Sequence, residues 1–403
     1  MILATSSTWD RSRSGLRAAL LLIAVGVSLA MALAEGILRF FPSLLSVELQ
    51  QVIEKDPDNF GVAHPYIGYL GTPNETYVQT GRDFRALIQT DGYGFRNAWP
   101  WPEKAEIVAV GDSVVFGYGV EHNQAWPTIL EKKLPGNHLI NLGLVGAGSQ
   151  QYLRLFETFG TRLHPKLLLV GFLVRNDFSN DYMFNRWLKS GAGGNFKVWQ
   201  DFGRPVSTRL SLDQPVSKLL TSLLWRVRLL ASKSRLFNLL LYIRSSLKSG
   251  PKEIKTFQAP DGSRLDLDVK GFINQTKDAQ PGSRGFDVSL DALRRMYSIA
   301  KTNGTKVLVI FQPSKEEVYL PLMGETNVET DPGRPLRAML EKIGIPYLDL
   351  LPAFRARAAK GEVLFFETDG HPDARGYALI AQLVLDYLKV NAKVFGLEVV
   401  AEK

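Results

Sequence analysis

The stretch Ile107-Val-Ala-Val-Gly111-Asp112-Ser113 decides the fold of this chain. Residues 107–110 form the short apolar run of a buried strand, and the chain then passes Gly117 and Gly119 toward a helix-like segment. A serine at this point lies at the carboxyl end of a strand, where open α/β sheets place their ligands. Gly-Asp-Ser is also a common turn sequence, so its meaning depends on the segments that lie downstream of it.

Downstream of Ser113, apolar runs and amphipathic segments alternate regularly. The unbroken apolar run 167–173 is typical of a parallel strand covered on both faces. The pattern therefore predicts an α/β fold with a doubly wound, flavodoxin-like parallel sheet. Further strands are expected near 138–141, 306–311 and 346–348, and helices near 124–134, after residue 149, near 290–301, near 335–342 and over 377–388.

Four regions are expected along the chain. Residues 1–45 form a cytoplasmic tail and membrane anchor, and residues 46–105 an extension that covers one sheet edge or brings Arg96 to a substrate. The sheet domain comprises 106–177 and 290–395. The insertion 178–289 is too long for a plain connection, so we expect it to have its own, largely helical, structure.

Residues 214–250 of the insertion contain seven Lys and Arg residues and no Asp or Glu. Two interpretations stay open for the helices expected there. They rest on an anionic membrane surface or form a basic wall over the site. Alternatively, their leucines pack on the main domain and their cations are solvated.

The amino-terminal region predicts a membrane anchor. Residues 18–34 are uncharged and mostly apolar, and continuation to Phe41 gives a helix long enough to span about 30 Å of hydrocarbon. Three arginines precede it, which keeps the tail in the cytoplasm and places the rest on the periplasmic side of the inner membrane. A cleaved signal peptide is the alternative, because Ala32-Leu-Ala34 fits the cleavage pattern. The length of the apolar run favours a retained, single-pass anchor.

Composition narrows the chemistry. The net charge of +8 suits contact with anionic surfaces, but no motif for nucleic acid is present. The chain has no cysteine, which excludes disulfides, thiolate metal sites and a cysteine nucleophile. Residues 146–151 half-imitate a dinucleotide fingerprint but lack its third glycine and the later acidic residue. We therefore expect no cofactor and no metal.

Three further segments give the Ser113 block its meaning. They are Asn141-Leu-Gly-Leu-Val-Gly146, Val174-Arg-Asn176-Asp177 and Asp369-Gly-His371-Pro372. In this order the four segments resemble the SGNH (GDSL-type) hydrolase family, whose blocks supply Ser, Gly, Asn and His. The region before residue 107 also looks like that of membrane-anchored bacterial members linked to cell-surface polysaccharides. The resemblance implies an enzyme that acts on ester bonds.

A serine hydroxyl attacks an ester only if a base accepts its proton and donors stabilise the oxyanion. His371 is the expected base for Ser113. The other four histidines lack a carboxylate at matching spacing. His122 is close to Ser113 in sequence, but it starts the next helix and is the weaker alternative.

The residue that orients the base is expected to be Asp369, with Glu367 in reserve. The commonest family pattern has an aspartate three residues before the histidine, and this chain has Thr368 there. The Asp-x-His spacing is also similar to that of alginate O-acetyltransferase-type proteins, which keeps acyl transfer open.

For the oxyanion hole, the resemblance implies the backbone N–H groups of Ser113 and Gly146 and the side-chain amide of Asn176. Taken singly, Gly146 and the pair Asn176-Asp177 also fit plain turns.

The predicted function is a serine esterase that removes acyl groups, including O-acetyl groups, from a cell-envelope glycan or lipid. One alternative is an O-acyltransferase to an exopolysaccharide that uses the same residues. The other is a non-catalytic glycan-binding or assembly protein on the same fold.

Overall fold

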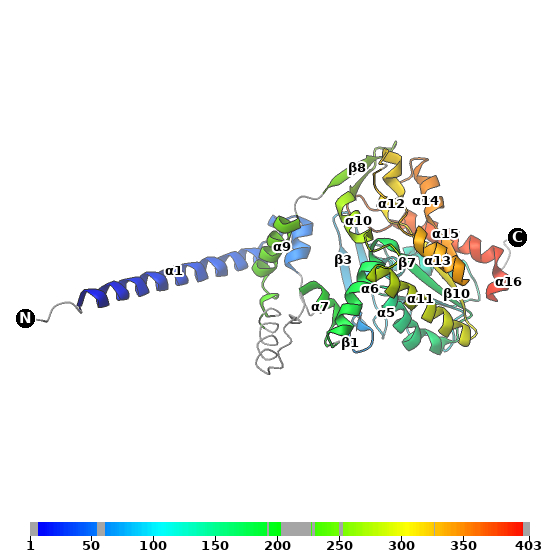
Figure 1. Ribbon diagram of the computed structural model, residues 1–403, viewed down its shortest axis with the longest axis horizontal. Coiled ribbons are helices and arrows are strands. Elements are labelled where there is room, and N and C mark those ends of the chain that lie inside the picture. The colour runs from blue at the N-terminus through cyan, green and yellow to red at the C-terminus, as the bar shows by residue number, and fades with distance from the viewer. Residues whose placement is uncertain are drawn as a thin grey trace, which may run out of the picture. The chain divides into compact units, whose positions relative to one another are not determined.

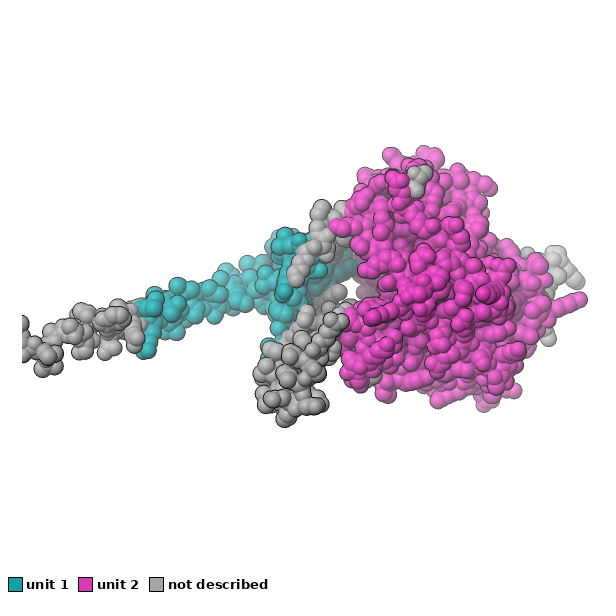
Figure 2. Space-filling model, in the orientation of Figure 1, with its two compact units in different colours: residues 1–59, 210–250 teal, residues 60–209, 251–403 magenta. Residues whose placement is uncertain are grey.

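The computed structural model of the chain describes residues 7–54, 61–191, 193–202, 227, 230–249, 253–325 and 327–397. The chain divides into two compact units (Figure 2). The smaller unit comprises residues 1–59 and 210–250, and the larger comprises 60–209 and 251–403. Much of the basic stretch expected to be helical, residues 214–226, lies outside the described residues.

The larger unit is built on a five-stranded sheet in which every neighbouring pair is parallel. Its order is β11-β10-β7-β5-β6. Every residue of β5, β6 and β7 is buried, as expected for strands covered on both faces. The predicted α/β fold with a parallel sheet is therefore confirmed. The strands are β5 (Ile107–Gly111), β6 (Leu139–Gly143), β7 (Leu167–Leu173), β10 (Lys306–Gln312) and β11 (Tyr347–Asp349).

Helices cover both faces of this sheet (Figure 1). Successive strand residues point to opposite sides, so Val108 and Val110 lie in one apolar core and Ile107 and Ala109 in the other. The first core is closed by α5 (Ser149–Leu155), α6 (Val174–Lys189), α11 (Arg284–Thr302) and α13 (Arg334–Ile343). The second is closed by α4 (Trp126–Lys132), α12 (Lys315–Tyr319), α14 (Leu351–Ala358) and α15 (Ala374–Val390).

The helix expected over 377–388 is α15. Its predicted apolar stripe is buried in the second core. Six short helical segments lie between or after the longer elements: η1 (Pro42–Leu44), η3 (His122–Gln124), η4 (Phe156–Gly160), η5 (Thr161–Leu163), η6 (Pro321–Met323) and α16 (Ala392–Phe395).

The region expected as an insertion is less uniform than predicted. It holds the end of α6, then α7 (Phe196–Phe202), α9 (Arg235–Ser249) and α10 (Val269–Thr276). It also contains an antiparallel hairpin of β8 (Ile254–Gln258) and β9 (Arg264–Asp268), which the largely helical prediction omitted. The signal for it was present, since Asp261-Gly262 is a turn sequence between two short alternating segments.

The extension before β5 forms two antiparallel hairpins. The first pairs β1 (Val62–His64) with β2 (Gly68–Leu70), and the second pairs β3 (Thr76–Thr80) with β4 (Arg85–Gln89).

The extension also covers the edge strand β6. Asn97 accepts a hydrogen bond from the backbone N–H of Asn141 at 2.7 Å and donates one to its carbonyl oxygen at 3.0 Å. The interpretation of the extension as a cover for one sheet edge is thereby supported.

Arg96 supports the loop after Ser113. Its guanidinium donates to the carbonyl oxygen of Gly117 at 2.6 Å and to that of Val120 at 3.1 Å. The residue is only 1% exposed, which fits a supporting role in the fold of this loop.

The described part of the smaller unit contains the helices α1 (Ser7–Phe40), α2 (Val47–Ile53) and α9 and the turn η1. Residues Leu16–Phe40 of α1 are long and apolar enough to cross a membrane, with a mean hydropathy of 2.3. Near the end of α1, the carboxylate of Glu35 accepts hydrogen bonds from the backbone N–H groups of Arg235 and Leu236 at 3.1 and 2.9 Å. It therefore caps the amino terminus of α9 from a neighbouring helix. Within this unit α9 packs on α1 and α2.

Candidate active site

Ser113 lies where β5 ends, as the first residue of the short helix α3 (Ser113–Phe116). Asp112 caps this helix, because its Oδ1 atom accepts a hydrogen bond from the backbone N–H of Val114 at 2.9 Å. Gly117 ends the helix in the left-handed conformation, with φ at 84°. A strand, one helical turn and a glycine reversal thus place the Ser113 hydroxyl at the carboxyl edge of the parallel sheet.

The structure brings Ser113, His371 and Asp369 together. The Nε2 atom of His371 lies 2.7 Å from the Oγ atom of Ser113. Its Nδ1 atom lies 2.6 Å from the Oδ1 atom of Asp369. With the ring proton on Nδ1 donated to the carboxylate, Nε2 is left to accept the serine proton.

Asp369 is held in its charged form. Burial alone would raise its pKa, but the charge of His371 and two hydrogen bonds from that residue outweigh burial and lower the pKa to about 2. The reserve candidate Glu367 contributes only its main-chain carbonyl oxygen to the described contacts around the site, which accepts from Lys315 and from the backbone of Asp266. Of the two candidates, Asp369 is therefore the carboxylate that contacts the imidazole.

Tyr118 packs on the flat side of the imidazole of His371. The two ring centroids are 4.3 Å apart and the planes are inclined by 25°. Burial, with the nearby charge of Asp369, raises the pKa of Tyr118 to about 12, so the phenol is neutral at physiological pH. The ring restricts the tilt of the imidazole without adding a charge.

The loop that carries His371 is tied down by two buried or half-buried charges. The Nζ atom of Lys315 donates to the carbonyl oxygens of Glu367 at 3.2 Å and Asp369 at 2.9 Å. The carboxylate of Asp83, in the β3–β4 hairpin, accepts three hydrogen bonds from Thr368 and Asp369. Sequence reasoning missed both charged residues, because the local sequence around residue 83 or 315 does not indicate a contact with a loop far along the chain.

Two of the three predicted oxyanion donors, Asn176 and Gly146, have different surroundings. Asn176 lies in the first turn of α6, not in a turn after the strand, and its amide donates to Oδ2 of the buried Asp112 at 3.2 Å. Gly146 has a positive φ of 78°, and a side chain there would approach Lys197 and Tyr69. The described contacts therefore join Asn176 to the serine block, whereas the role of Gly146 as a donor stays a prediction.

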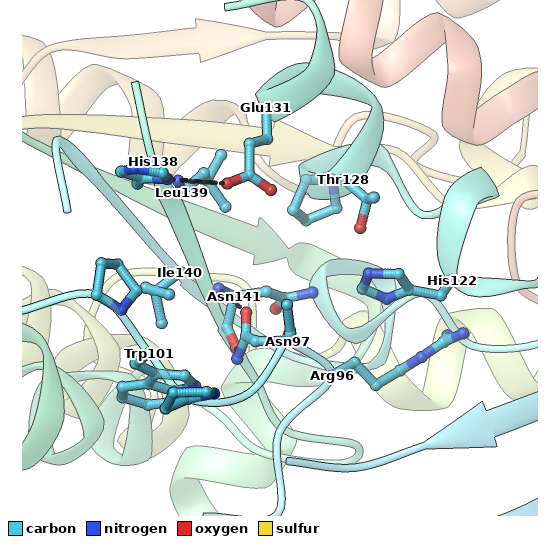
Figure 3. A pocket seen from close by; sticks show the side chains of 14 residues that line it. Arg96, Asn97, Trp101, His122, Thr128, Glu131, His138, Leu139, Ile140 and Asn141 are labelled. Atoms are coloured by element: carbon cyan, nitrogen blue, oxygen red, sulfur yellow. Dashed lines mark hydrogen bonds and ion pairs between the residues drawn. The ribbon is translucent and has the colours of Figure 1, made fainter. Parts of the chain in front are cut away.

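His122, the weaker alternative base, lies elsewhere. It lines a pocket of about 320 Å³ along the edge strand β6, together with Trp101, Glu131 and Asn141 (Figure 3). Ser113 and His371 are not among the residues that line this pocket. Within the described ranges, no group of three or more His, Asp or Glu side chains is placed to hold a metal ion.

No family model and no curated protein matches the sequence. Several solved structures are similar to it. A lipolytic protein of the G-D-S-L family from Veillonella parvula is 14% identical, with a TM-score of 0.36 over 70% of this chain and 97% of that one. A GDSL-like lipase from Bacteroides thetaiotaomicron is 13% identical, with a TM-score of 0.34 over 73% and 92%. An acetylxylan esterase from Geobacillus stearothermophilus is 12% identical, with a TM-score of 0.36 over 75% and 99%.

Proposed function

We propose that this chain is a serine hydrolase of the SGNH type that cleaves acyl esters. One observation carries the proposal: the hydroxyl of Ser113 lies within hydrogen-bond distance of an imidazole whose other nitrogen contacts an ionised carboxylate. Such an arrangement is what an alcohol needs to become a nucleophile.

In this mechanism the Oγ atom of Ser113 attacks the ester carbonyl while its proton passes to Nε2 of His371. Asp369 stabilises the imidazolium that forms. The imidazolium then gives the proton to the leaving alcohol, and an acyl-enzyme remains on Ser113. A water molecule then attacks the acyl-enzyme while the same imidazole accepts its proton. The free acid is released as the imidazolium returns that proton to the Oγ atom of Ser113.

We assign the oxyanion hole to the backbone N–H groups of Ser113 and Gly146 and to the amide of Asn176. The amide has two N–H groups, and a single one suffices for the contact with Asp112. The other is available to an oxyanion that forms next to Ser113. One such donor stabilises the transition state by about 3 kcal/mol.

We further propose that α1 is retained as a single-pass anchor and that the larger unit faces the periplasm. The helix runs without a break through Ala34 and Glu35, the two residues that flank the predicted cleavage point. Cleavage there would put a new charged terminus at Glu35, the residue that caps α9. An anchored esterase on that side acts on acylated cell-envelope glycans or lipids, and the likeness of the amino-terminal region to polysaccharide-linked proteins favours glycans.

Transfer of the acyl group to a sugar hydroxyl remains the second candidate, because the Asp-x-His spacing is similar to that of alginate O-acetyltransferase-type proteins. The contact of Asp369 with His371 supports a role for that spacing. A non-catalytic role had two motives, the departure at Thr368 and the basic insertion. The contact of Asp369 with His371 argues against the first, since the imidazole still has a carboxylate partner.

The test uses the full chain purified in detergent. A fluorophosphonate probe, which phosphonylates activated serines, should label wild type at Ser113 and leave Ser113→Ala unlabelled. p-Nitrophenyl esters of acetate, butyrate and octanoate should be hydrolysed by wild type only. A wild-type chain that neither reacts with the probe nor hydrolyses any ester contradicts the proposal. With an acetyl donor and a glycan present, free acid alone indicates hydrolysis and acetylated glycan indicates transfer.

A further inference from the structure

We infer that Asp83 is a positioning residue for the proposed reaction: a carboxylate from the amino-terminal extension that fixes the loop carrying Asp369 and His371. The inference rests on the proposed function and adds to it a residue that lies outside all four sequence blocks.

The contacts of Asp83 are specific to that loop. Its Oδ2 atom accepts from the backbone N–H of Thr368 at 2.6 Å, from the hydroxyl of Thr368 at 2.7 Å and from the backbone N–H of Asp369 at 3.0 Å. Hydrogen bonds to an ionised acceptor are about twice as strong as neutral ones. One carboxylate oxygen therefore fixes the main chain of Asp369 through hydrogen bonds that leave the carboxylate of Asp369 itself free for His371.

The same contacts explain the departure at Thr368. In the common family pattern an aspartate at this position reaches the histidine. Here the hydroxyl of Thr368 turns to Asp83, while the contact with the imidazole comes from Asp369, two residues before His371. Compared with that pattern, the carboxylate that contacts the imidazole is one residue nearer to His371, and the residue at the usual position pairs with a carboxylate from another segment.

The hairpin that carries Asp83 also contacts the loop after Ser113. The ring of Phe84 lies 5.5 Å from that of Tyr118, which stacks on His371. The side-chain oxygen of Gln79 accepts from the backbone N–H of Gly119 at 2.8 Å. A single hairpin thus sets the spacing between the two loops that carry the serine and the histidine.

Asp83 positions the imidazole of His371 indirectly, through the backbone and the carboxylate of Asp369. The backbone of Asp369 is held by Asp83 through its N–H and by Lys315 through its carbonyl oxygen. Its carboxylate then directs Nδ1 of His371, and Nε2 faces Ser113. A misplacement of about 1 Å in such an arrangement lowers the rate roughly 100-fold.

The experiment compares Asp83→Ala, Asp83→Asn and Glu75→Ala in the full chain in detergent. Glu75→Ala is the matched control, because it removes an exposed carboxylate at the residue that directly precedes β3 of the same hairpin. For p-nitrophenyl acetate we expect Asp83→Ala to lower kcat about 10- to 100-fold and to change KM less than about threefold. Asp83→Asn should recover part of kcat, because the amide oxygen still accepts hydrogen bonds. Glu75→Ala should match wild type.

A second measurement does not depend on turnover. In one-dimensional proton NMR spectra, the Nδ1 proton shared by His371 and Asp369 should give a far-downfield resonance that is lost in His371→Gln. We expect it to broaden or disappear in Asp83→Ala and to persist in Glu75→Ala. A thermal melt of each variant checks that the chain is folded.

The outcomes are separable. If folded Asp83→Ala keeps the resonance and a kcat within twofold of wild type, the positioning role is wrong. If the resonance is also unchanged while wild type is neither active nor labelled by the fluorophosphonate, both ideas fail. If wild type is inactive but the resonance responds to Asp83 alone, the esterase proposal fails and the positioning role stands.

Discussion

At the scale of single residues, the proposed chemistry depends on which carboxylate faces His371. Asp369 and Glu367 are two residues apart on one loop, yet only Asp369 contacts the imidazole. The spacing from His371 to each carboxylate left both open in the sequence. Burial and backbone direction select between them, and neither can be read from spacing alone.

The first prediction is that Asp369→Asn lowers kcat for p-nitrophenyl acetate by about 10³- to 10⁴-fold with little change in KM, because an amide favours the wrong tautomer of the imidazole. Steady-state kinetics of the purified chain measure this. Glu367→Gln is the control and should stay within about twofold of wild type. Equal losses in both variants would contradict the assignment.

The second prediction concerns pH. The pKa of Asp369 is about 2 in the folded chain and 3.8 without its partners, so the carboxylate stabilises the fold above pH 4 and loses this effect as pH falls toward 2. By linkage the contribution is on the order of 2 kcal/mol. Urea unfolding of wild type and Asp369→Asn should therefore give free energies of unfolding that converge between pH 5 and pH 2. A difference that stays constant over this range would refute the coupling.

Asp83 shows what sequence reasoning cannot reach at this scale. Its partner lies 285 residues away along the chain, and an Asp between Arg82 and Phe84 reads as an ordinary hairpin turn. Ser113 and His371 were accessible because each stands in a recognisable block at a strand or helix end. A residue that acts through hydrogen bonds to another loop has no such block.

At the scale of elements, the site depends on the turn that comes after Ser113. Three carbonyl oxygens of this turn accept from Arg96, a side chain with a pKa lowered by burial. Helix α11 illustrates how such local features move element ends. It begins at Arg284, earlier than its apolar pattern indicated, because the hydroxyl of Ser283 caps its first turn.

The third prediction is that Arg96→Lys destabilises the fold by about 1–3 kcal/mol, since one ammonium cannot reach all the carbonyl oxygens and leaves buried acceptors unpaired. Chemical unfolding monitored by tryptophan fluorescence measures this, and the ester hydrolysis rate should fall as well. Arg85→Lys, on an exposed position of the same extension, is the control and should change stability by less than about 0.5 kcal/mol. A stable, fully active Arg96→Lys chain would show that the turn does not need this support.

At the scale of the whole molecule, the strand and helix periods predicted the sheet domain, but they did not predict which unit each part of the insertion joins. Residues 210–250 belong to the smaller unit with α1 and α2, whereas β8, β9 and α10 belong to the larger one. The leucine spacing of α9 predicts an amphipathic helix, whichever unit covers its apolar face. Amphipathicity shows that a helix has a partner, and the identity of that partner depends on long-range packing.

The fourth prediction is that Glu35→Ala lowers the hydrogen-exchange protection of the first turn of α9 about fivefold, the equivalent of a lost helix cap of about 1 kcal/mol. Exchange followed by mass spectrometry in detergent or nanodiscs measures this. Glu54→Ala is the matched control, because it removes another carboxylate that pairs with Arg235, through the guanidinium and not through the backbone N–H groups of the first turn. Protection that is equal in Glu35→Ala and wild type would mean that α9 does not depend on this cap.

The hydrogen bonds between Asn97 and Asn141 limit how the protein can be shortened for laboratory work. A truncation that starts at β5 would discard Asn97 and leave backbone groups of the edge strand β6 unpaired. Such an edge can pair with another copy of the protein and cause aggregation. It would also discard the carboxylate that steadies the histidine loop. A water-soluble version freed of its apolar leader should therefore start upstream of Val62, so that both hairpins travel with the sheet.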